Sequence, residues 1–128
     1  MKLEDFNIVY LNLDKRKDRN TAMKKQLKKF NLNAERISAV YGKGLRDKKY
    51  RLKLSNELNV SEKKLRVSYW MNRSNFKTMI NQEDPVLGRV GCFLSHMKIM
   101  KHALDNGWNN VLVIEDDRSE ERRVGKEC

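Results

Sequence analysis

Cysteine, proline and histidine are scarce in this chain of 128 residues, which holds two Cys, one Pro and two His. Cys92 and Cys128 are too few for a disulfide framework, and neither lies in a spacing typical of zinc sites. His96 and His102 fall on different faces of a helix, which argues against a metal-binding pair. This pattern favours a reducing compartment, and we expect a cytoplasmic protein.

Long hydrophobic runs are also missing, since no apolar stretch approaches the ~20 residues of a membrane-spanning helix. Glu4 and Asp5 stand where a secretory signal would carry its basic and apolar segments. Hydrophobic residues make up 39% of the chain, which is enough to form a core. The sequence therefore predicts a soluble domain, or part of one.

Positive charge is what the chain has in excess, with a net charge of +11. Residues 43–80 contribute +8 of this charge, because they contain eleven Lys and Arg but only three acidic residues, Asp47, Glu57 and Glu62. Such a segment attracts phosphate-bearing partners, which include nucleic acid, anionic membrane surfaces and sugar nucleotides. Charge alone does not choose among these partners, and a hydrated Lys-rich surface is the simplest alternative.

The last eleven residues, RSEERRVGKEC, differ from the rest because they show neither strand nor helix periodicity. They resemble the in-frame translation of a common sequencing-library adapter. We therefore expect residues 118–128 to be a non-native tail outside the fold. A natural charged tail is the alternative.

Hydrophobic patterning predicts a β-α-β unit at the start of the chain. Residues 6–13, FNIVYLNL, are typical of a strand buried on both faces. A helix capped by Asp18 is expected to run to about Phe30. Residues 34–42 then alternate as a second strand. The fold class predicted from this order is α/β, with a mostly parallel sheet and flanking helices.

Residues 43–85 follow with a weaker pattern. We interpret them as a basic insertion with short local helices, one of which is capped by Ser61.

A strong helical pattern comes after Gly88 and Gly91. Its apolar residues recur at i, i+4, i+7 and i+11, as expected of a buried helix face. These residues are Phe93, Met97, Met100 and Leu104. Gly107 is placed to end the helix, and residues 111–114 form a second wholly apolar strand.

Three acidic residues, Glu115, Asp116 and Asp117, directly follow this last strand. Open α/β sheets bind ligands at the carboxyl ends of their strands. Glu115 and Asp117 project to the same side of an extended chain and offer oxygen ligands to Mg²⁺ or Mn²⁺. A cation there would neutralise charge on a departing nucleoside diphosphate. An ordinary hydrated turn is the alternative.

Polar residues also follow the first strand. Arg16 and Arg19 lie near the start of the predicted helix, where guanidinium and backbone N–H groups can hold phosphate. Asn12 is placed to hydrogen-bond a base or a ribose. Surface charges and a helix cap are the alternative interpretation.

Gly88 and Gly91 give a weak phosphate-loop signal ahead of Ser95 and His96. His96 could equally make a structural hydrogen bond between helix and sheet.

Taken together and in this order, these segments resemble glycosyltransferase family 25, of the lipooligosaccharide and procollagen galactosyltransferase type. The resemblance is carried by IVYLNLDKRKDR, RISAVYG, GRVGCFLSHMKIMKHAL and an apolar strand ending in EDD. It covers residues 6–42 and 86–117. It implies a GT-A-like, Rossmann-like fold, of which residues 1–117 would be the truncated N-terminal part that binds a nucleotide sugar.

The resemblance also implies an inverting hexosyltransferase of the kind used in lipopolysaccharide biosynthesis. Its donor would be a UDP-sugar, often UDP-galactose, and its acceptor a glycan, a glycolipid or a protein. Mn²⁺ or Mg²⁺ would be held by Glu115 and Asp117. The positions that the resemblance assigns to the substrate are Asn12, Arg16, Arg19, Ser95, His96 and Asp116.

An inverting transfer needs a carboxylate base for the acceptor hydroxyl, and the sequence identifies none. GT-A enzymes usually carry this base in their C-terminal half. We therefore expect that this chain alone performs no transfer.

Two other functions stay open. The first is a basic nucleic-acid-binding module, in which Tyr69, Trp70 and Phe76 interleave with the basic residues. It leaves the acidic strand end and the Ser-His helix unexplained, so no nucleic acid is expected. The second is a Rossmann-like interaction domain without catalysis. The basic segment could also contact an anionic membrane from the side.

Overall fold

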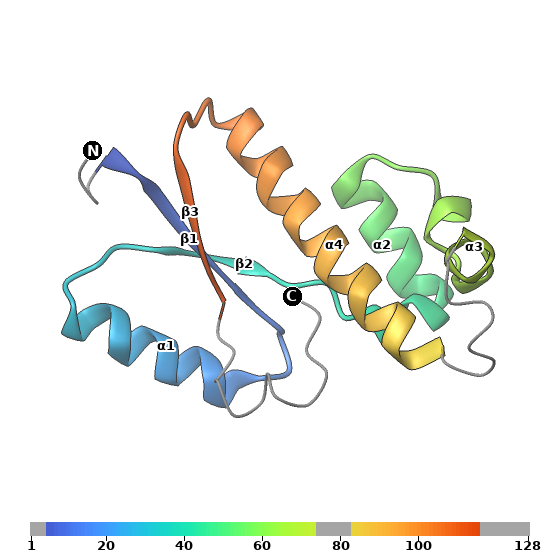
Figure 1. Ribbon diagram of the computed structural model, residues 1–128, viewed down its shortest axis with the longest axis horizontal. Helices are drawn as coiled ribbons and strands as arrows, with labels where there is room; N and C mark the ends of the chain where they lie inside the picture. Colours follow the sequence, from blue (N-terminus) through green and yellow to red (C-terminus); the bar gives the residue numbers. More distant parts are fainter. Residues whose placement is uncertain (1–4, 74–82, 116–128) are drawn as a thin grey trace. The chain divides into compact units, whose positions relative to one another are not determined.

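The computed structural model describes residues 5–73 and 83–115 (Figure 1). Asp116, Asp117 and the predicted tail lie outside these residues, as does Phe76. The described residues pack as two compact units. The first unit holds residues 5–39 and 99–115, and the second unit holds residues 40–73 and 83–98.

The first unit is built on a parallel sheet of three strands in the order β2-β1-β3. Its elements are β1 (Asn7–Asn12), α1 (Lys17–Lys29), β2 (Glu35–Ser38) and β3 (Val111–Glu115) (Figure 1). Leu11 pairs with Ile37 on one side and with Glu115 on the other, so the three strands end at a common edge. The predicted α/β, Rossmann-like fold class is confirmed.

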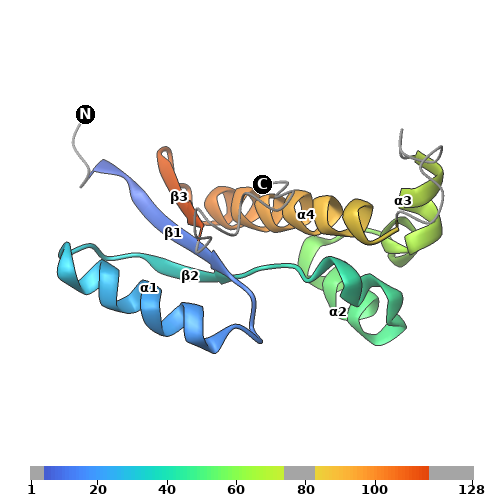
Figure 2. The same cartoon turned by 60° about the horizontal axis from the view of Figure 1, so that its bottom comes forward.

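The central strand β1 is buried on both faces, as its continuous apolar sequence predicted. Successive side chains of a strand point to opposite faces. Val9 and Leu11 therefore share a face, where they pack with Ile99 of the long helix α4 (Glu83–Asp105). On the opposite face the Tyr10 hydroxyl donates to Oδ1 of Asn20 in α1, at 2.7 Å. Figure 2 shows α1 running beside β1 and β2.

Two predicted boundaries in this part of the chain are wrong. Arg16 occupies the N-cap position of α1, so Asp18 lies inside the first turn and is not the N-cap residue. β2 ends at Ser38, and Gly42 begins a 3-10 helix instead of ending the strand. The strand is four residues long because only residues 35–38 pair with β1.

The second unit is helical. Its elements are η2 (Gly42–Arg46), α2 (Lys48–Leu58), η3 (Glu62–Leu65), α3 (Val67–Arg73) and the first part of α4 (Glu83–Asp105). The predicted local helices of the basic insertion are confirmed. Ser61 caps η3 as expected, since its side chain accepts from the N–H of Lys63.

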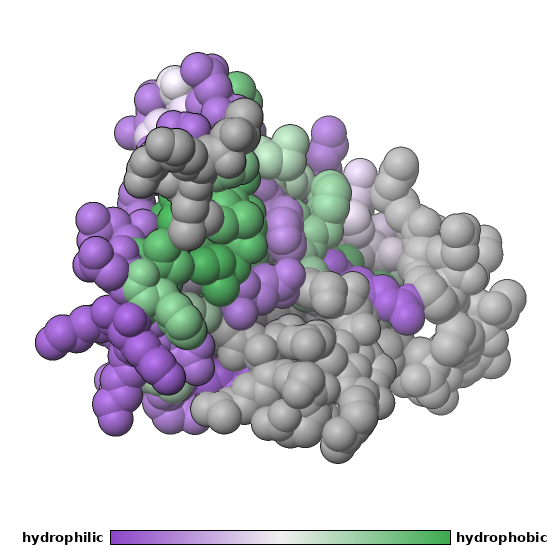
Figure 3. All heavy atoms as spheres, turned by 60° about the vertical axis from the view of Figure 1, so that its left-hand side comes forward, coloured by the Kyte–Doolittle hydropathy of each residue, from purple (hydrophilic) through white to green (hydrophobic). Residues whose placement is uncertain are grey.

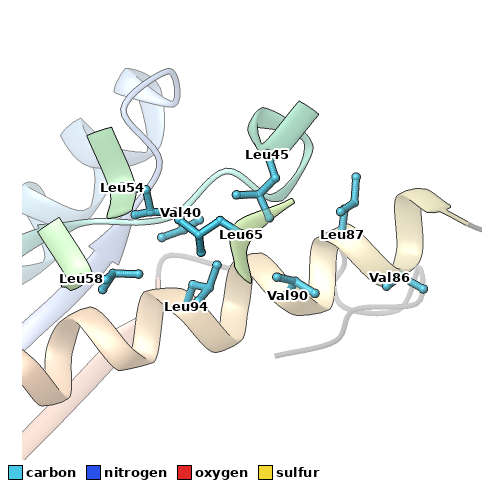
Figure 4. Close-up of a cluster of buried hydrophobic side chains, with 9 residues drawn as sticks. All are labelled: Val40, Leu45, Leu54, Leu58, Leu65, Val86, Leu87, Val90 and Leu94. Atoms are coloured by element: carbon cyan, nitrogen blue, oxygen red, sulfur yellow. The ribbon is translucent and has the colours of Figure 1, made fainter. Parts of the chain in front are cut away.

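A single apolar core holds the second unit together. Its members come from every helix described there except α3, whose Val67, Trp70 and Met71 pack against it from outside. The buried side chains are Val40, Leu45, Leu54, Leu58, Leu65, Val86, Leu87, Val90 and Leu94 (Figure 4).

The predicted buried face of α4 is wrong. Phe93, Met100 and Leu104 are 54%, 64% and 80% exposed, and only Met97 of the predicted stripe packs against the core. The side chains that α4 buries in the second unit are Val86, Leu87, Val90 and Leu94. α4 begins at Glu83, before the glycines, so these four apolar residues belong to the helix as well. They form a second apolar stripe on another face of α4. Phe93, Met100 and Leu104 are therefore exposed. Figure 3 shows that hydrophobic residues gather on part of the face that it draws.

Glycines set how closely α4 approaches the segment that follows β2. A Cβ atom on Gly42 would lie 1.9 Å from the carbonyl oxygen of Leu87, and one on Gly91 would lie 2.9 Å from the backbone nitrogen of Gly42. Gly88 and Gly91 both lie inside the helix, so the predicted loop ahead of it is wrong. Gly91 instead allows two backbones to touch.

Candidate functional site

The carboxyl edge of the sheet in the first unit is the candidate site. β1 lies between β2 and β3, so the chain leaves β1 toward one neighbour and reaches the other through a later crossover. Ligands of open α/β sheets bind outside the carboxyl ends of the strands at such a switch point. The pairing of Leu11 with Glu115 brings the exposed Glu115 beside Asn12, the last residue of β1. The acidic strand end and the β1–α1 loop therefore share one edge.

Asn12 is buried, with 2% of its surface exposed. Its Nδ2 donates to the carbonyl oxygen of Arg16 at 3.1 Å, and its Oδ1 accepts from Nε of Arg36 at 3.0 Å. These bonds hold the loop between β1 and α1 in place. The contact of Asn12 with a base or ribose stays a prediction.

Arg36 and Asp14 complete this edge, although neither was predicted to be a site residue. Nη2 of Arg36 donates to Oδ1 of Asp14 at 2.6 Å and to the carbonyl oxygen of Asn12 at 3.1 Å. The hydroxyl of Ser38 donates to the same Asp14 oxygen at 2.8 Å. The signal was the spacing of Arg36 and Ser38, because two residues apart on a strand share a face.

Arg16 makes a two-pronged contact with Asp18 at the start of α1. Its Nε and Nη2 donate to Oδ1 and Oδ2 at 3.2 and 3.0 Å. The hydrogen bond from Arg16 lowers the pKa of Asp18 to about 2, with a smaller contribution from the backbone N–H of Arg19. Arg19 is half-buried in the same turn. Both arginines lie at the predicted edge, and their contact with phosphate stays a prediction.

The pair gives a pH-dependent expectation. The Asp18 carboxyl should titrate at about 2 instead of its usual 3.8. The contribution of the Arg16–Asp18 pair to the stability of the folded state is therefore present above pH 3.8 and is lost as the pH falls through about 2. Carbon-detected NMR titration of the carboxyl measures this midpoint. Arg16→Ala should return it toward 3.8. A wild-type midpoint near 3.8 contradicts the expectation.

Ser95 and His96 belong to the second unit. The Ser95 hydroxyl is buried, accepts from the N–H of Val40 at 2.8 Å and donates to the carbonyl oxygen of Gly91 at 2.7 Å. It thus fixes α4 to the segment after β2. Nδ1 of His96 lies 2.9 Å from the carbonyl oxygen of Cys92. Because a carbonyl only accepts, Nδ1 carries the hydrogen of this contact, and Nε2 of the neutral ring is an acceptor. The role of both residues at a donor sugar stays a prediction.

The metal ligands can be placed only in part. Glu115 lies at the end of β3 with an exposed side chain, whereas Asp116 and Asp117 are outside the described residues. Within residues 5–73 and 83–115, no three His, Cys, Asp or Glu side chains gather into a metal-binding group. The Mn²⁺ or Mg²⁺ site stays a prediction.

Part of the charge in the basic segment is structural. Glu62 accepts from Nη2 of Arg66 at 3.0 Å and from Nε of Arg51 at 2.8 Å, and these bonds, that of Arg66 first, lower its pKa to about 2. Arg51 also donates to the carbonyl oxygen of Leu45 at 2.6 Å, which ties α2, η2 and η3 together.

Of the helices that the structure describes, none combines the length and the apolar character needed to cross a membrane.

A parallel sheet with polar and acidic residues at the switch point is the arrangement of the Rossmann-like class. The chain belongs to glycosyltransferase family 25: the family described as "Glycosyltransferase family 25 (LPS biosynthesis protein)" matches residues 6–122. The predicted resemblance is confirmed.

Curated relatives agree with this assignment. A glycosyltransferase 25 family member of Anopheles gambiae is 31% identical over 91% of this chain. Procollagen galactosyltransferase 1-B of Xenopus laevis is 30% identical over 91%, and procollagen galactosyltransferase 2 of Mus musculus is 31% identical over 86%. The chain spans 17%, 16% and 15% of the lengths of these three proteins. No solved structure matches the chain.

Proposed function

We propose that this chain forms the nucleotide-binding part of a GT-A glycosyltransferase that uses a UDP-sugar, with UDP-galactose as the first candidate. Family membership supports the reaction class, and two relatives that are procollagen galactosyltransferases support galactose as the sugar. The observation that carries the proposal is the register of β1 and β3. It brings the acidic end of β3 to the same edge as the loop that holds Arg16.

A divalent cation fits the chemistry of this edge. Glu115 ends β3, and the sequence continues with two more carboxylates, so Glu115 and Asp117 would hold Mn²⁺ or Mg²⁺, with Asp116 beside the donor. When bound, such a cation neutralises charge on the diphosphate leaving group.

The chain's own residues would orient the donor. Arg36 holds Asn12 and Asp14, so the loop after β1 is shaped before a ligand arrives. Arg16 now pairs with Asp18, and a diphosphate would compete with this carboxylate for the guanidinium group. Arg19 would approach the same phosphates.

The acceptor and stereochemistry belong to the same proposal. The transfer would invert the anomeric carbon and deliver the sugar to a hydroxyl of a glycan, a glycolipid or a protein, as in lipopolysaccharide biosynthesis. The exposed lysines of η2 and α2, such as Lys43 and Lys53, would favour an acceptor at an anionic membrane surface. We expect no transfer by this chain alone, because no carboxylate in it is assigned as the base.

Titration of UDP with Mn²⁺ tests the proposal. We expect UDP to raise the melting temperature only when Mn²⁺ is present, because the ligand binds the folded state through the cation. Glu115→Gln should weaken UDP–Mn²⁺ binding by roughly tenfold or more, the cost of removing one charged ligand. Differential scanning calorimetry measures the melting temperature, and isothermal titration calorimetry measures the affinity.

Glu57→Gln is the matched control, since Glu57 is an exposed carboxylate of α2 in the second unit. It should bind UDP–Mn²⁺ as the wild type does. Equal binding by Glu115→Gln and wild type would refute the metal assignment. Binding of a short DNA oligomer with a steep salt dependence, and none of UDP, would favour the nucleic-acid module instead. Turnover in a glycosylation assay would refute the expectation of inactivity.

A further inference from the structure

A second concave site lies at the amino edge of the sheet in the first unit, at the opposite end of the strands from the carboxyl edge. Its volume is about 440 Å³, within the ~300–1,000 Å³ range of small-molecule sites. Its lining comes from the start of β1, the segment that leads into β2 and the turn before β3. The side chains that matter are Phe6, Asn7, Ile8, Asn33, Glu35 and Trp108.

Two side-chain amides of this pocket are not used by the fold. Asn7 donates its backbone N–H to the carbonyl oxygen of Asn110 at 2.8 Å, but its side chain makes no hydrogen bond to any described residue. The same holds for the exposed side chain of Asn33 within the described ranges. Each amide therefore offers both donors and an acceptor to a ligand.

A carboxylate and an indole are held at the same pocket by His102. Oε2 of Glu35 lies 2.8 Å from Nε2 of His102, within ion-pair distance although the atoms are not aligned for a hydrogen bond. The His102 ring meets the Trp108 ring edge-on, with centroids 5.0 Å apart and an interplanar angle of 88°. Trp108 also packs against the buried side chains of the sheet. The indole is thus a fixed apolar wall beside an acceptor.

This combination selects a class of ligand. A phosphate-bearing ligand is disfavoured because the described lining residues include a carboxyl group, that of Glu35, and no Lys or Arg. A metal cation is disfavoured because Glu35 is the single carboxylate among the described lining residues, whereas such ions are usually held by several oxygen ligands. A sugar ring fits both halves of the lining: its hydroxyls donate and accept at once, as the Asn amides do, and its C–H face packs on an aromatic ring.

We propose that the amino-edge pocket binds one neutral monosaccharide unit of a glycan. β1 has six residues, so the pocket lies about 20 Å from the carboxyl edge. Both sites can therefore be filled at the same time. The proposal does not rest on the nucleotide site: failure of UDP to bind leaves it intact, and failure of sugars to bind leaves the nucleotide site intact.

NMR titration with methyl β-galactoside, methyl β-glucoside and methyl N-acetyl-β-glucosaminide tests the pocket. We expect at least one glycoside to shift the side-chain amide signals of Asn7 and Asn33 and the indole N–H of Trp108, saturating in the millimolar range. Asn33→Ala, a change at an exposed side chain, should weaken this binding by about fivefold, the effect of one lost hydrogen bond.

Asn56→Ala is the matched control, because Asn56 is an exposed residue of α2 in the second unit. Its affinity for the glycoside should equal that of the wild type. The proposal is overturned if none of the three glycosides moves the pocket signals, or if Asn33→Ala binds the glycoside as tightly as Asn56→Ala does.

Discussion

Gly42→Ala should destabilise the chain by about 3 kcal/mol, the upper end of the range for overpacking. The added Cβ would lie 1.9 Å from the carbonyl oxygen of Leu87 and 2.6 Å from its carbonyl carbon. Both atoms belong to the backbone of α4, which cannot rotate away as a side chain can. The helix would have to move, and the neighbouring contact of Gly91 with Gly42 would open. Guanidinium unfolding followed by circular dichroism measures the loss.

Gly44→Ala provides the comparison in the same short helix. The three atoms nearest to its new Cβ all belong to the ring of Tyr50, the closest at 2.9 Å. A ring can shift by a few tenths of an ångström, so a loss of about 1 kcal/mol or less is expected. Similar unfolding midpoints for the two variants would show that the contact between Gly42 and Leu87 does not limit the packing of the second unit.

Leu45→Ala should lower the free energy of unfolding by about 2–5 kcal/mol, the cost of a cavity in a core that relaxes only in part. Leu45 has no exposed surface and lies among the buried side chains of the second unit (Figure 4). Leu52→Ala makes the same chemical change on α2 at a residue that is 46% exposed, and should cost only about 0.5 kcal/mol. Urea denaturation of both variants tests the difference. A Leu52 effect as large as that of Leu45 would contradict the assigned core.

The sequence predicts the sheet of the first unit well, because its signals are local. FNIVYLNL and VLVIE are continuous apolar runs, and both become strands of a parallel sheet. Their shared edge follows from topology, since parallel strands end together. The hydrogen bonds of Arg36 to Asn12 and Asp14 could not be predicted in the same way, because they join residues 22 and 24 positions apart.

The error on α4 has a physical cause. Periodicity locates an apolar stripe but does not choose between two stripes on one helix. Leu87, Gly91 and Leu94 fall at i, i+4 and i+7, on the face where Gly91 meets Gly42. Close approach of two backbones thus selected that face and left Phe93, Met100 and Leu104 outside. A glycine flanked by leucines at helical spacing was the signal that would have identified it.

The buried amide of Asn12 has a consequence for how the strands find their alignment. Asn12 lies on the α1 side of β1, where Arg16 and Arg36 satisfy its amide, whereas Val9 and Leu11 face the apolar side. A slip of β1 by one residue would reverse every side chain and push this amide among Ile37 and Ile99, without partners. One polar residue therefore penalises the mispaired sheet that a wholly apolar strand would tolerate.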